Sequence, residues 1–264
     1  MQEINIFVAM MKAIEIIKYM ESLYNEEQRQ GLMRFFKTGK GEYGEGDEFL
    51  GLKVPQTREI VKQCKDCPLS EVPELLMSRW HEVRLCGLLL MVSQFEQLAK
   101  KGLENDDEAI RKRDEILQLY LQYSDRANNW DLVDLSAPKI LGAWLLLPTL
   151  LGDGTDSYKL QVLDELAKSQ SLWRQRISMV CTLRTSQQGD ASWCLRYAEI
   201  HLHHPHDLMH KAVGWMLREM GKRVSMDLLR DFLRLHAHEM PRTTLRYAIE
   251  KMPEAERKKW LCRQ

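Results

Sequence analysis

The sequence contains no apolar run long enough to cross a membrane and no dense set of cysteines. None of its stretches approaches the roughly 20 apolar residues that a membrane-spanning helix needs. The segment from Ile4 to Met20 carries Lys12, Glu15 and Lys18 at helical spacing, where a signal peptide would have an uninterrupted apolar core. The six cysteines are scattered, which is typical of reduced thiols. These absences predict a cytoplasmic protein that does not associate with membranes.

The sequence also lacks the alternation of apolar and polar residues that marks a β-strand. Apolar residues instead recur at i, i+3, i+4 and i+7, among Leu, Met, Ala, Glu, Lys and Arg, which favour helices. The pattern predicts an all-α fold, with Pro55 and Pro241 at helix starts. The expected helices span residues 4–24, 26–37, 55–64, 70–77, 81–98, 107–123, 129–146, 157–168, 172–185, 191–202, 207–221, 226–236 and 242–251.

Five of these helices look like variations on one theme. They begin about 35 to 47 residues apart, near His81, Asn129, Leu172, Asp207 and Pro241. This is the period of HEAT-type helix pairs, which stack into a right-handed solenoid with a concave binding surface. We therefore expect one domain over residues 1–264, with N-terminal helices in 1–65 and stacked helix pairs in 69–252.

The net charge is zero, which by itself argues against nucleic acid, but the charges are unevenly distributed. From Ser171 to the end, 17 Lys and Arg stand against 10 Asp and Glu, and seven of the eight histidines also lie there. A basic binding face on a neutral protein gives this distribution, and so does a solvated helical surface. Basic groups that could follow a phosphate backbone lie near the starts of the repeated helices: Arg84, Arg174, Arg176, His210, Lys211, Arg242 and Arg246.

Three motifs with familiar chemistry have simpler interpretations. The loop at residues 39–48 contains Gly-x-Gly-x-x-Gly, but a helix precedes it and its acidic residues would repel a pyrophosphate, so we expect a flexible loop. Cys64 and Cys67 form a Cys-x-x-Cys without a second pair. In the histidine run 201–206, Pro205 interrupts the helix, which favours a polar turn. We expect no metal and no other cofactor.

Residues 128–134 read Asn-Asn-Trp-Asp-Leu-Val-Asp, and their spacing is the most informative in the chain. On a helix, Trp130 and Asp134 share one face, while Leu132 and Val133 point elsewhere and can be buried. A carboxylate beside an exposed indole suits a cationic ligand or a transition state that gains positive charge. A Trp buried in the core and an Asp that only interacts with the helix dipole would produce the same sequence.

A second aromatic residue, Trp215, is flanked by cations. Lys211, Trp215, Arg218 and Lys222 fall on one stripe of the helix at 207–221, and the opposite side is apolar. A buried Trp rarely shares its stripe with three cations, so we expect an exposed surface that binds anions. Further upstream, Arg176 could hold a phosphate bidentately or form only a surface salt bridge.

Three motifs in this order resemble those of the AlkD-like DNA alkylation repair proteins, which are DNA glycosylases built from HEAT-like repeats. They are Trp130-Asp-Leu-Val-Asp134, Trp173-Arg-Gln-Arg176 and Lys211-Ala-Val-Gly-Trp-Met-Leu-Arg218-Glu. Segments 32–37 and 51–58 are also similar to the N-terminal part of that family, so the resemblance covers nearly the whole chain.

The resemblance implies that Asp134 is the catalytic carboxylate and that Trp130 and Trp215 are aromatic walls against the sugar of a lesion. Its implied reaction is excision of positively charged N3- or N7-alkylated purines from double-stranded DNA, without base flipping. We expect a monomer that acts on DNA in the nucleoid. The expected DNA-binding residues are Arg176, Arg218, Lys211, Arg174, Arg84, Arg246 and Phe35.

Phe35 departs from the pattern, because the family can carry a tyrosine there and the hydroxyl is missing here. Two alternatives to the enzyme stay open. One is a binder of damaged or branched DNA on the same scaffold that performs no chemistry. The other is a protein-binding helical scaffold, which would need an apolar groove in place of an indole-and-cation surface. Asp134 argues against the first, and the basic excess of the C-terminal part argues against the second.

Overall fold

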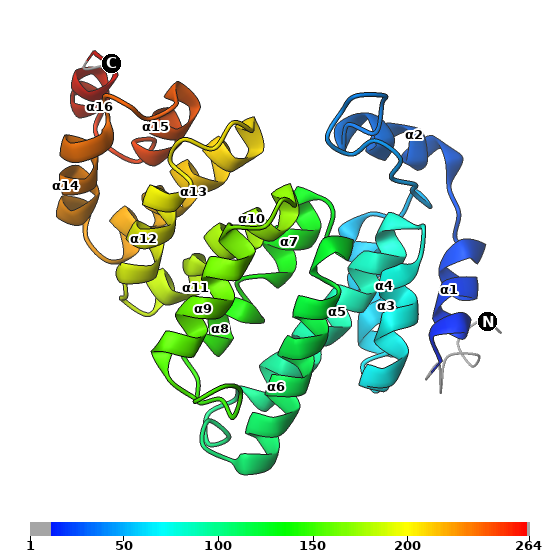
Figure 1. Ribbon diagram of the computed structural model, residues 1–264. Helices are drawn as coiled ribbons and strands as arrows, with labels where there is room; N and C mark the ends of the chain where they lie inside the picture. The colour runs from blue at the N-terminus through cyan, green and yellow to red at the C-terminus, as the bar shows by residue number, and fades with distance from the viewer. Residues whose placement is uncertain (1–11, 263–264) are drawn as a thin grey trace. The chain divides into compact units, whose positions relative to one another are not determined.

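The computed structural model describes residues 12–262, and this part of the chain is built from helices joined by turns and loops (Figure 1). The described residues contain no β-strand; Glu48 and Trp80 form an isolated parallel bridge. The all-α class expected from the apolar periodicity is thereby confirmed. Residues 4–11 of the first expected helix lie outside the described part. Among residues 12–262, no helix is both long and apolar enough to cross a lipid bilayer.

The chain divides into two compact units, and the first ends at Ser136. Its described helices are α1 (Ala13–Ser22), α2 (Glu26–Phe35), α3 (Val54–Gln63), α4 (Val72–Met77), α5 (His81–Leu98), α6 (Asp107–Gln122) and α7 (Trp130–Ser136), with short 3₁₀ turns at Leu69–Glu71 and Ser124–Arg126. The expected boundary between residues 65 and 69 lies inside this unit, where α3 and α4 both pack against α5.

The second unit begins at Ala137. Its described helices are α8 (Leu141–Trp144), α9 (Asp156–Ala167), α10 (Leu172–Val180), α11 (Thr182–Gln187), α12 (Ser192–Ile200), α13 (Asp207–Arg223), α14 (Met226–His236), α15 (Arg242–Ala248) and α16 (Glu254–Leu261). Helix α9 packs against α10, and α13 packs against α12, α14 and α15. Neighbouring helices therefore cover one another's apolar faces, as expected for stacked helix pairs.

Helix α5 forms the centre of the first unit. Its residues from Val83 to Val92 are almost all apolar and buried, and it packs against α3, α4, α6 and α7. A helix that is apolar on all sides is stable only when neighbours cover it completely. The two polar residues of its first turn, His81 and Glu82, are therefore held in the interior of the unit, at exposed fractions of 2% and 1%.

Two expected helices are each divided in the structure, and one helix was missed. The helix expected over 129–146 is two helices, because α7 ends at Ser136, two residues before Pro138. Proline has no N–H to donate and disfavours the helical conformation of the residue before it. The helix expected over 172–185 divides at Cys181 into α10 and α11. Helix α16, which follows Pro253, was not expected at all, although a proline at that position favours a helix start.

The glycine-rich segment at 39–48 is a loop, as expected, and it is tied internally. Glu42 and Glu45 accept hydrogen bonds from the backbone N–H groups of Gly39 and Gly41. A Cβ atom on Gly44 would lie 2.5 Å from the carbonyl oxygen of Phe36, so only glycine permits this close approach. The loop returns the chain to the interior at Asp47, which is buried.

Candidate active site in the first unit

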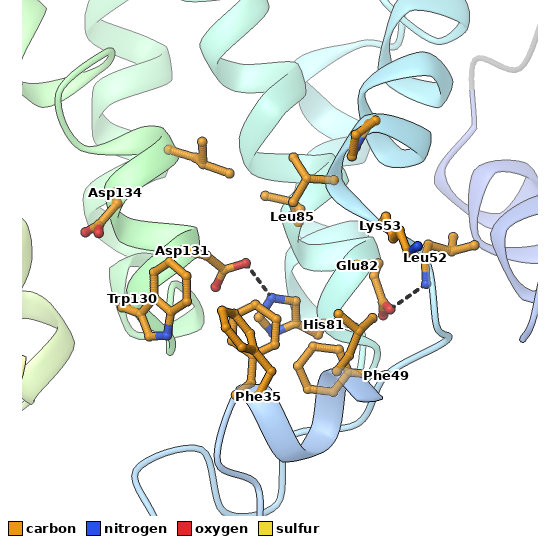
Figure 2. Close-up of a pocket in the computed structure, with 15 residues that line it drawn as sticks. Phe35, Phe49, Leu52, Lys53, His81, Glu82, Leu85, Trp130, Asp131 and Asp134 are labelled. Carbon is orange, nitrogen blue, oxygen red and sulfur yellow. Dashed lines mark hydrogen bonds and ion pairs between the residues drawn. The ribbon is translucent and has the colours of Figure 1, made fainter. Parts of the chain in front are cut away.

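Trp130 and Asp134 line the same cavity on the surface of α7 (Figure 2). Helix α7 begins at Trp130, whose backbone N–H donates to the side-chain oxygen of Asn129 at 2.9 Å. Leu132 and Val133 are fully buried on the other side of the helix, whereas Trp130 and Asp134 are half-buried. The expectation that a spacing of four residues places the indole and the carboxylate on one face is confirmed.

The cavity has a volume of about 420 Å³ and lies wholly within the first unit. Its walls are mainly apolar, and α2, α3, α5 and α7 contribute to them together with the segment before α3. The lining residues are Leu32, Phe35, Phe36, Phe49, Leu52, Lys53, Val54, Pro55, His81, Glu82, Leu85, Trp130, Asp131, Asp134 and Leu135.

Aromatic rings fix the indole of Trp130 at this cavity. The ring of Phe36 stacks on Trp130 with 5.3 Å between centroids, and Phe35 meets the same indole edge to face at 5.8 Å. Phe36 also stacks on Phe49 at 5.2 Å, which continues the aromatic wall inward. Phe35 is 61% exposed, so it forms the outer rim of the wall. Offset and edge-to-face contacts of this kind each add to the energy of simple burial.

Beneath this wall, His81 lies between two buried carboxylates. Its Nδ1 is 2.7 Å from Oδ2 of Asp47, and its Nε2 is 3.0 Å from Oδ2 of Asp131. Burial alone would lower the pKa of His81, but the charge and hydrogen bond of Asp131, aided by Asp47, outweigh it and raise the pKa to about 9. Burial would raise the pKa of Asp47, yet the contacts with His81 and Arg84 bring it below its usual value. His81 is therefore an imidazolium at neutral pH.

Glu82 fixes the segment that leads into α3. Its carboxylate accepts three backbone hydrogen bonds, from Leu50 at 2.8 Å, Gly51 at 2.9 Å and Leu52 at 3.0 Å. Gly51 has a φ of +91°, and a Cβ there would lie 2.2 Å from the carbonyl oxygen of Asn25. Through these contacts a side chain at the start of α5 positions Leu52 and the residues after it along the cavity.

We expect Glu82→Gln to lower the free energy of unfolding by about 1 to 3 kcal/mol. The amide –NH₂ would face a backbone N–H that now donates to a carboxylate oxygen, leaving a buried donor without an acceptor. The midpoint of urea unfolding measures this loss. Glu96→Gln, at an exposed position on the same helix, is the control and should change stability by less than about 0.5 kcal/mol. Equal midpoints for the two variants would show that Glu82 does not hold the segment.

The arrangement of groups at the cavity favours a positively charged ligand. The half-buried Asp134 carboxylate lies at the edge of an apolar cavity, where the effective dielectric constant is lower than in water and charges interact more strongly. The π-face of an indole attracts cations as well. Together the two groups suit a reaction in which positive charge develops near α7.

The second unit contains the other expected aromatic residue, on α13, and the expected apolar side of this helix is confirmed. Its apolar side is buried, through Val213, Met216, Leu217 and Met220. Trp215 is half-buried and Lys222 is exposed on the other side. The side chain of Lys211 is 41% exposed and pairs with Asp207 at 2.7 Å. Arg218 forms ion pairs with Glu250 and Glu219.

The expectation that Arg84 projects to a phosphate-binding surface is corrected by its burial. It is 2% exposed and donates to Asp47 and to the carbonyl oxygens of Ser78 and Arg79. It therefore stabilises the interior beside the cavity. Arg176 is 4% exposed and donates to the carbonyl oxygen of Leu208 at 2.6 Å.

The remaining expected DNA contacts lie nearer the surface. Arg174 is half-buried at the start of α10, and Arg246 is exposed on α15. The phosphate contacts expected of Arg174 and Arg246 stay predictions. The phosphate contact expected of Arg176 is corrected as that of Arg84 is, because its side chain is buried and donates to a backbone carbonyl.

The histidine run at 201–206 forms a turn whose rings contact the protein. Nε2 of His201 lies 2.9 Å from the hydroxyl oxygen of Ser178, and Nε2 of His204 lies 2.8 Å from Oε1 of Gln175. His206 caps α13 by accepting from the backbone N–H of Leu208. In residues 12–262, no group of three or more His, Cys, Asp or Glu side chains is arranged to hold a metal ion.

Several residues of this site were not expected from the sequence: Phe36, Phe49, Lys53, His81, Glu82 and Asp131. One signal could have identified His81, because it is the only histidine in the sequence before residue 171 and it precedes the apolar run from Leu85 to Val92. A polar pair at the start of a fully buried helix needs partners in the interior.

Comparisons with known proteins agree with this fold. The model of the DNA alkylation repair enzyme family matches residues 16–252, so the chain belongs to that family. The structure is similar to that of a predicted DNA alkylation repair enzyme from Enterococcus faecalis, with a TM-score of 0.62 and 13% sequence identity, over 88% of this chain and 97% of that one. A comparison with curated proteins gave no match. Family membership indicates an enzyme of DNA repair that acts on DNA.

Proposed function

We propose that the protein is a DNA glycosylase that removes positively charged N3- or N7-alkylated purines from duplex DNA. The observation that carries this proposal is the pairing of Asp134 with Trp130 at the edge of an apolar cavity. Membership of the DNA alkylation repair enzyme family supports DNA as the substrate.

The chemistry of such a lesion matches these two groups. Alkylation at N3 or N7 makes the purine cationic, so the base leaves with the electrons of the C1′–N bond and becomes neutral. The deoxyribose passes through an oxocarbenium-like state, and a water oxygen then adds to C1′ and loses a proton to the solvent. The carboxylate of Asp134 stabilises the positive charge on the sugar, and the indole of Trp130 attracts it. No strong general acid is required for this leaving group.

The second unit supplies the proposed contacts with the DNA backbone. Trp215 provides a further aromatic face, and Lys211, Arg218 and Arg246 contact phosphates. Phe35, exposed at the rim of the cavity, approaches the DNA through apolar contact alone because it has no hydroxyl. In this proposal the lesion stays stacked in the duplex, and the enzyme reaches it from the backbone.

We expect Lys211→Ala to weaken binding to damaged and undamaged duplexes equally. Each phosphate contact releases counterions without reading sequence, so the slope of log affinity against log salt should decrease by about 0.9. Lys112→Ala is the matched control, because Lys112 forms the same i,i+4 pair, with Glu108, on α6. A slope equal to that of the wild type for Lys211→Ala would place this residue outside the DNA interface.

The function itself is tested by incubating the protein with methylated duplex DNA and separating the released bases by chromatography. We expect free 3-methyladenine and 7-methylguanine, in amounts that increase with time and enzyme. Tight binding of methylated DNA without released base would instead support a binder that performs no chemistry.

A further inference from the structure

His81 makes contacts that the proposed reaction does not use. It is the first residue of α5, it is almost fully buried, and both ring nitrogens face carboxylate oxygens. Figure 2 shows its ring beside Asp131, next to the aromatic wall. A neutral imidazole has a single N–H, so only an imidazolium can donate to Asp47 and Asp131 at the same time.

These two hydrogen bonds join three segments of the first unit. Asp47 lies near the end of the glycine-rich loop, His81 starts α5, and Asp131 is the second residue of α7. The imidazole also stacks on Phe49, at 4.4 Å between centroids, and lies 5.0 Å from Phe36.

His81 also supports the indole of Trp130 indirectly, because Phe36, which His81 contacts, stacks on Trp130. His81 therefore holds the start of α7 in two ways. It holds Asp131 through a charged hydrogen bond, and it supports Trp130 through the ring of Phe36.

We propose that His81 is a positioning residue of this site, whose charged ring fixes the first turn of α7 so that Trp130 and Asp134 face the cavity. The role rests on the proposed function, because it is defined by the two groups that would act on the lesion. It differs from a catalytic role, since Asp47 and Asp131 occupy both ring nitrogens.

The charged groups around His81 make this arrangement sensitive to alkaline pH. Asp47 and Asp131 face the ring directly, Arg84 on α5 donates to Asp47, and Arg126 interacts electrostatically with both Arg84 and Asp47. When His81 loses its proton, one nitrogen presents a lone pair to a carboxylate and that hydrogen bond is lost. The raised pKa means that both bonds persist at neutral pH and that one disappears as the pH rises through about 9.

The test is the single-turnover rate of base excision between about pH 6 and about pH 10. We expect the wild-type rate to fall as the pH passes through about 9. Asp131→Asn replaces the carboxylate that most favours the imidazolium form of His81 with a neutral amide. The fall in excision rate should therefore occur at least about one pH unit lower than in the wild type. In His81→Gln, the fall in excision rate at alkaline pH should disappear. At neutral pH, the excision rate of this variant should be lower than that of the wild type by up to about tenfold. All variants act on the same duplex, so alkaline changes in the substrate affect them equally.

Arg113→Met provides the control for a loss of stability alone. Arg113 is fully buried in the same unit and donates to the carbonyl oxygens of Leu98, Leu103 and Glu104, away from the cavity. We expect this variant to unfold more easily but to keep the wild-type rate per folded molecule and the wild-type pH dependence. An Asp131→Asn profile that falls at the same pH as the wild type would overturn the proposal.

Two measurements without DNA separate this proposal from the function it rests on. The imidazole NMR signals of His81 should titrate near pH 9. The fluorescence difference between the wild type and Trp130→Phe should change over the same range, because the indole loses its support. If the wild type released no base at any pH, the proposed function would fail, while these readouts would still decide the role of His81. Titration of His81 below about pH 7, or a fluorescence difference that stays constant through pH 9, would overturn the positioning role.

Discussion

Asp134→Asn should lower the rate of base excision at least about tenfold, which corresponds to about 1.4 kcal/mol of lost transition-state stabilisation. The amide keeps the size and most of the hydrogen-bonding capacity of the carboxylate but removes its charge. A carboxylate near a developing cation acts mainly in the transition state, so affinity for the duplex should stay within about threefold of the wild type. Single-turnover excision and equilibrium binding, measured on the same duplex, separate the two effects.

Asp125→Asn is the control for this substitution, because it neutralises an exposed carboxylate in the same unit. It should leave the rate within about twofold of the wild type. If Asp134→Asn excised bases at the wild-type rate, Asp134 would not be the catalytic carboxylate, and the site on α7 would need another interpretation.

Trp130→Leu should lower the excision rate by about twofold to thirtyfold, or roughly 0.5 to 2 kcal/mol, and should cost less in thermal stability. The indole is half-buried at the cavity, so leucine preserves part of its apolar contact with Phe36 but removes the face that attracts a cation. The comparison needs a thermal melt and a single-turnover rate from the same preparation.

Trp144→Leu is the comparison for a tryptophan of the core, because the indole of Trp144 is fully buried in the second unit. We expect it to destabilise the protein by about 3 kcal/mol while the folded fraction keeps a normal rate. The interpretation of Trp130 fails if its substitution behaves in the same way, with a large loss of melting temperature and an unchanged rate per folded molecule.

The sequence predicted which face of α7 lines the cavity, because that face depends only on local spacing. Trp130 and Asp134 are four residues apart, and any helix through both places them on one side. The same reasoning correctly separated the apolar side of α13 from its stripe with Trp215. It failed where a single residue ends a helix: Pro138 divides the expected helix at 129–146, which helical periodicity alone did not show.

The support of the site could not be predicted from local spacing, because its members are distant in the sequence. His81 lies 34 residues from Asp47 and 50 residues from Asp131. Asp47 was interpreted only as an acidic residue of a loop that would repel a pyrophosphate. Nothing in the spacing of either carboxylate indicates that the fold brings both to one imidazole.

Arg84 shows how a local pattern can mislead. Arg84 lies in the first turn of its helix, as the other expected basic residues lie near the starts of theirs. Residues 83–92 of α5 are nevertheless buried, and the helix packs against four others. The burial of the helix, which follows from its composition, determines the environment of Arg84 more strongly than its position in the turn. Lys211, Arg218 and Arg246 lie on helices with a polar side, so their expected DNA contacts do not conflict with burial.

The central claim is that a carboxylate and an indole on α7 cleave the bond to a positively charged base. The most direct measurement compares single-turnover excision from two duplexes that differ only at one position, with N7-methylguanine in one and neutral 8-oxoguanine in the other. We expect abasic sites to form in the first duplex and not in the second, because only the cationic base leaves without protonation. Equal excision from both duplexes, or none from either at saturating enzyme, would contradict this claim.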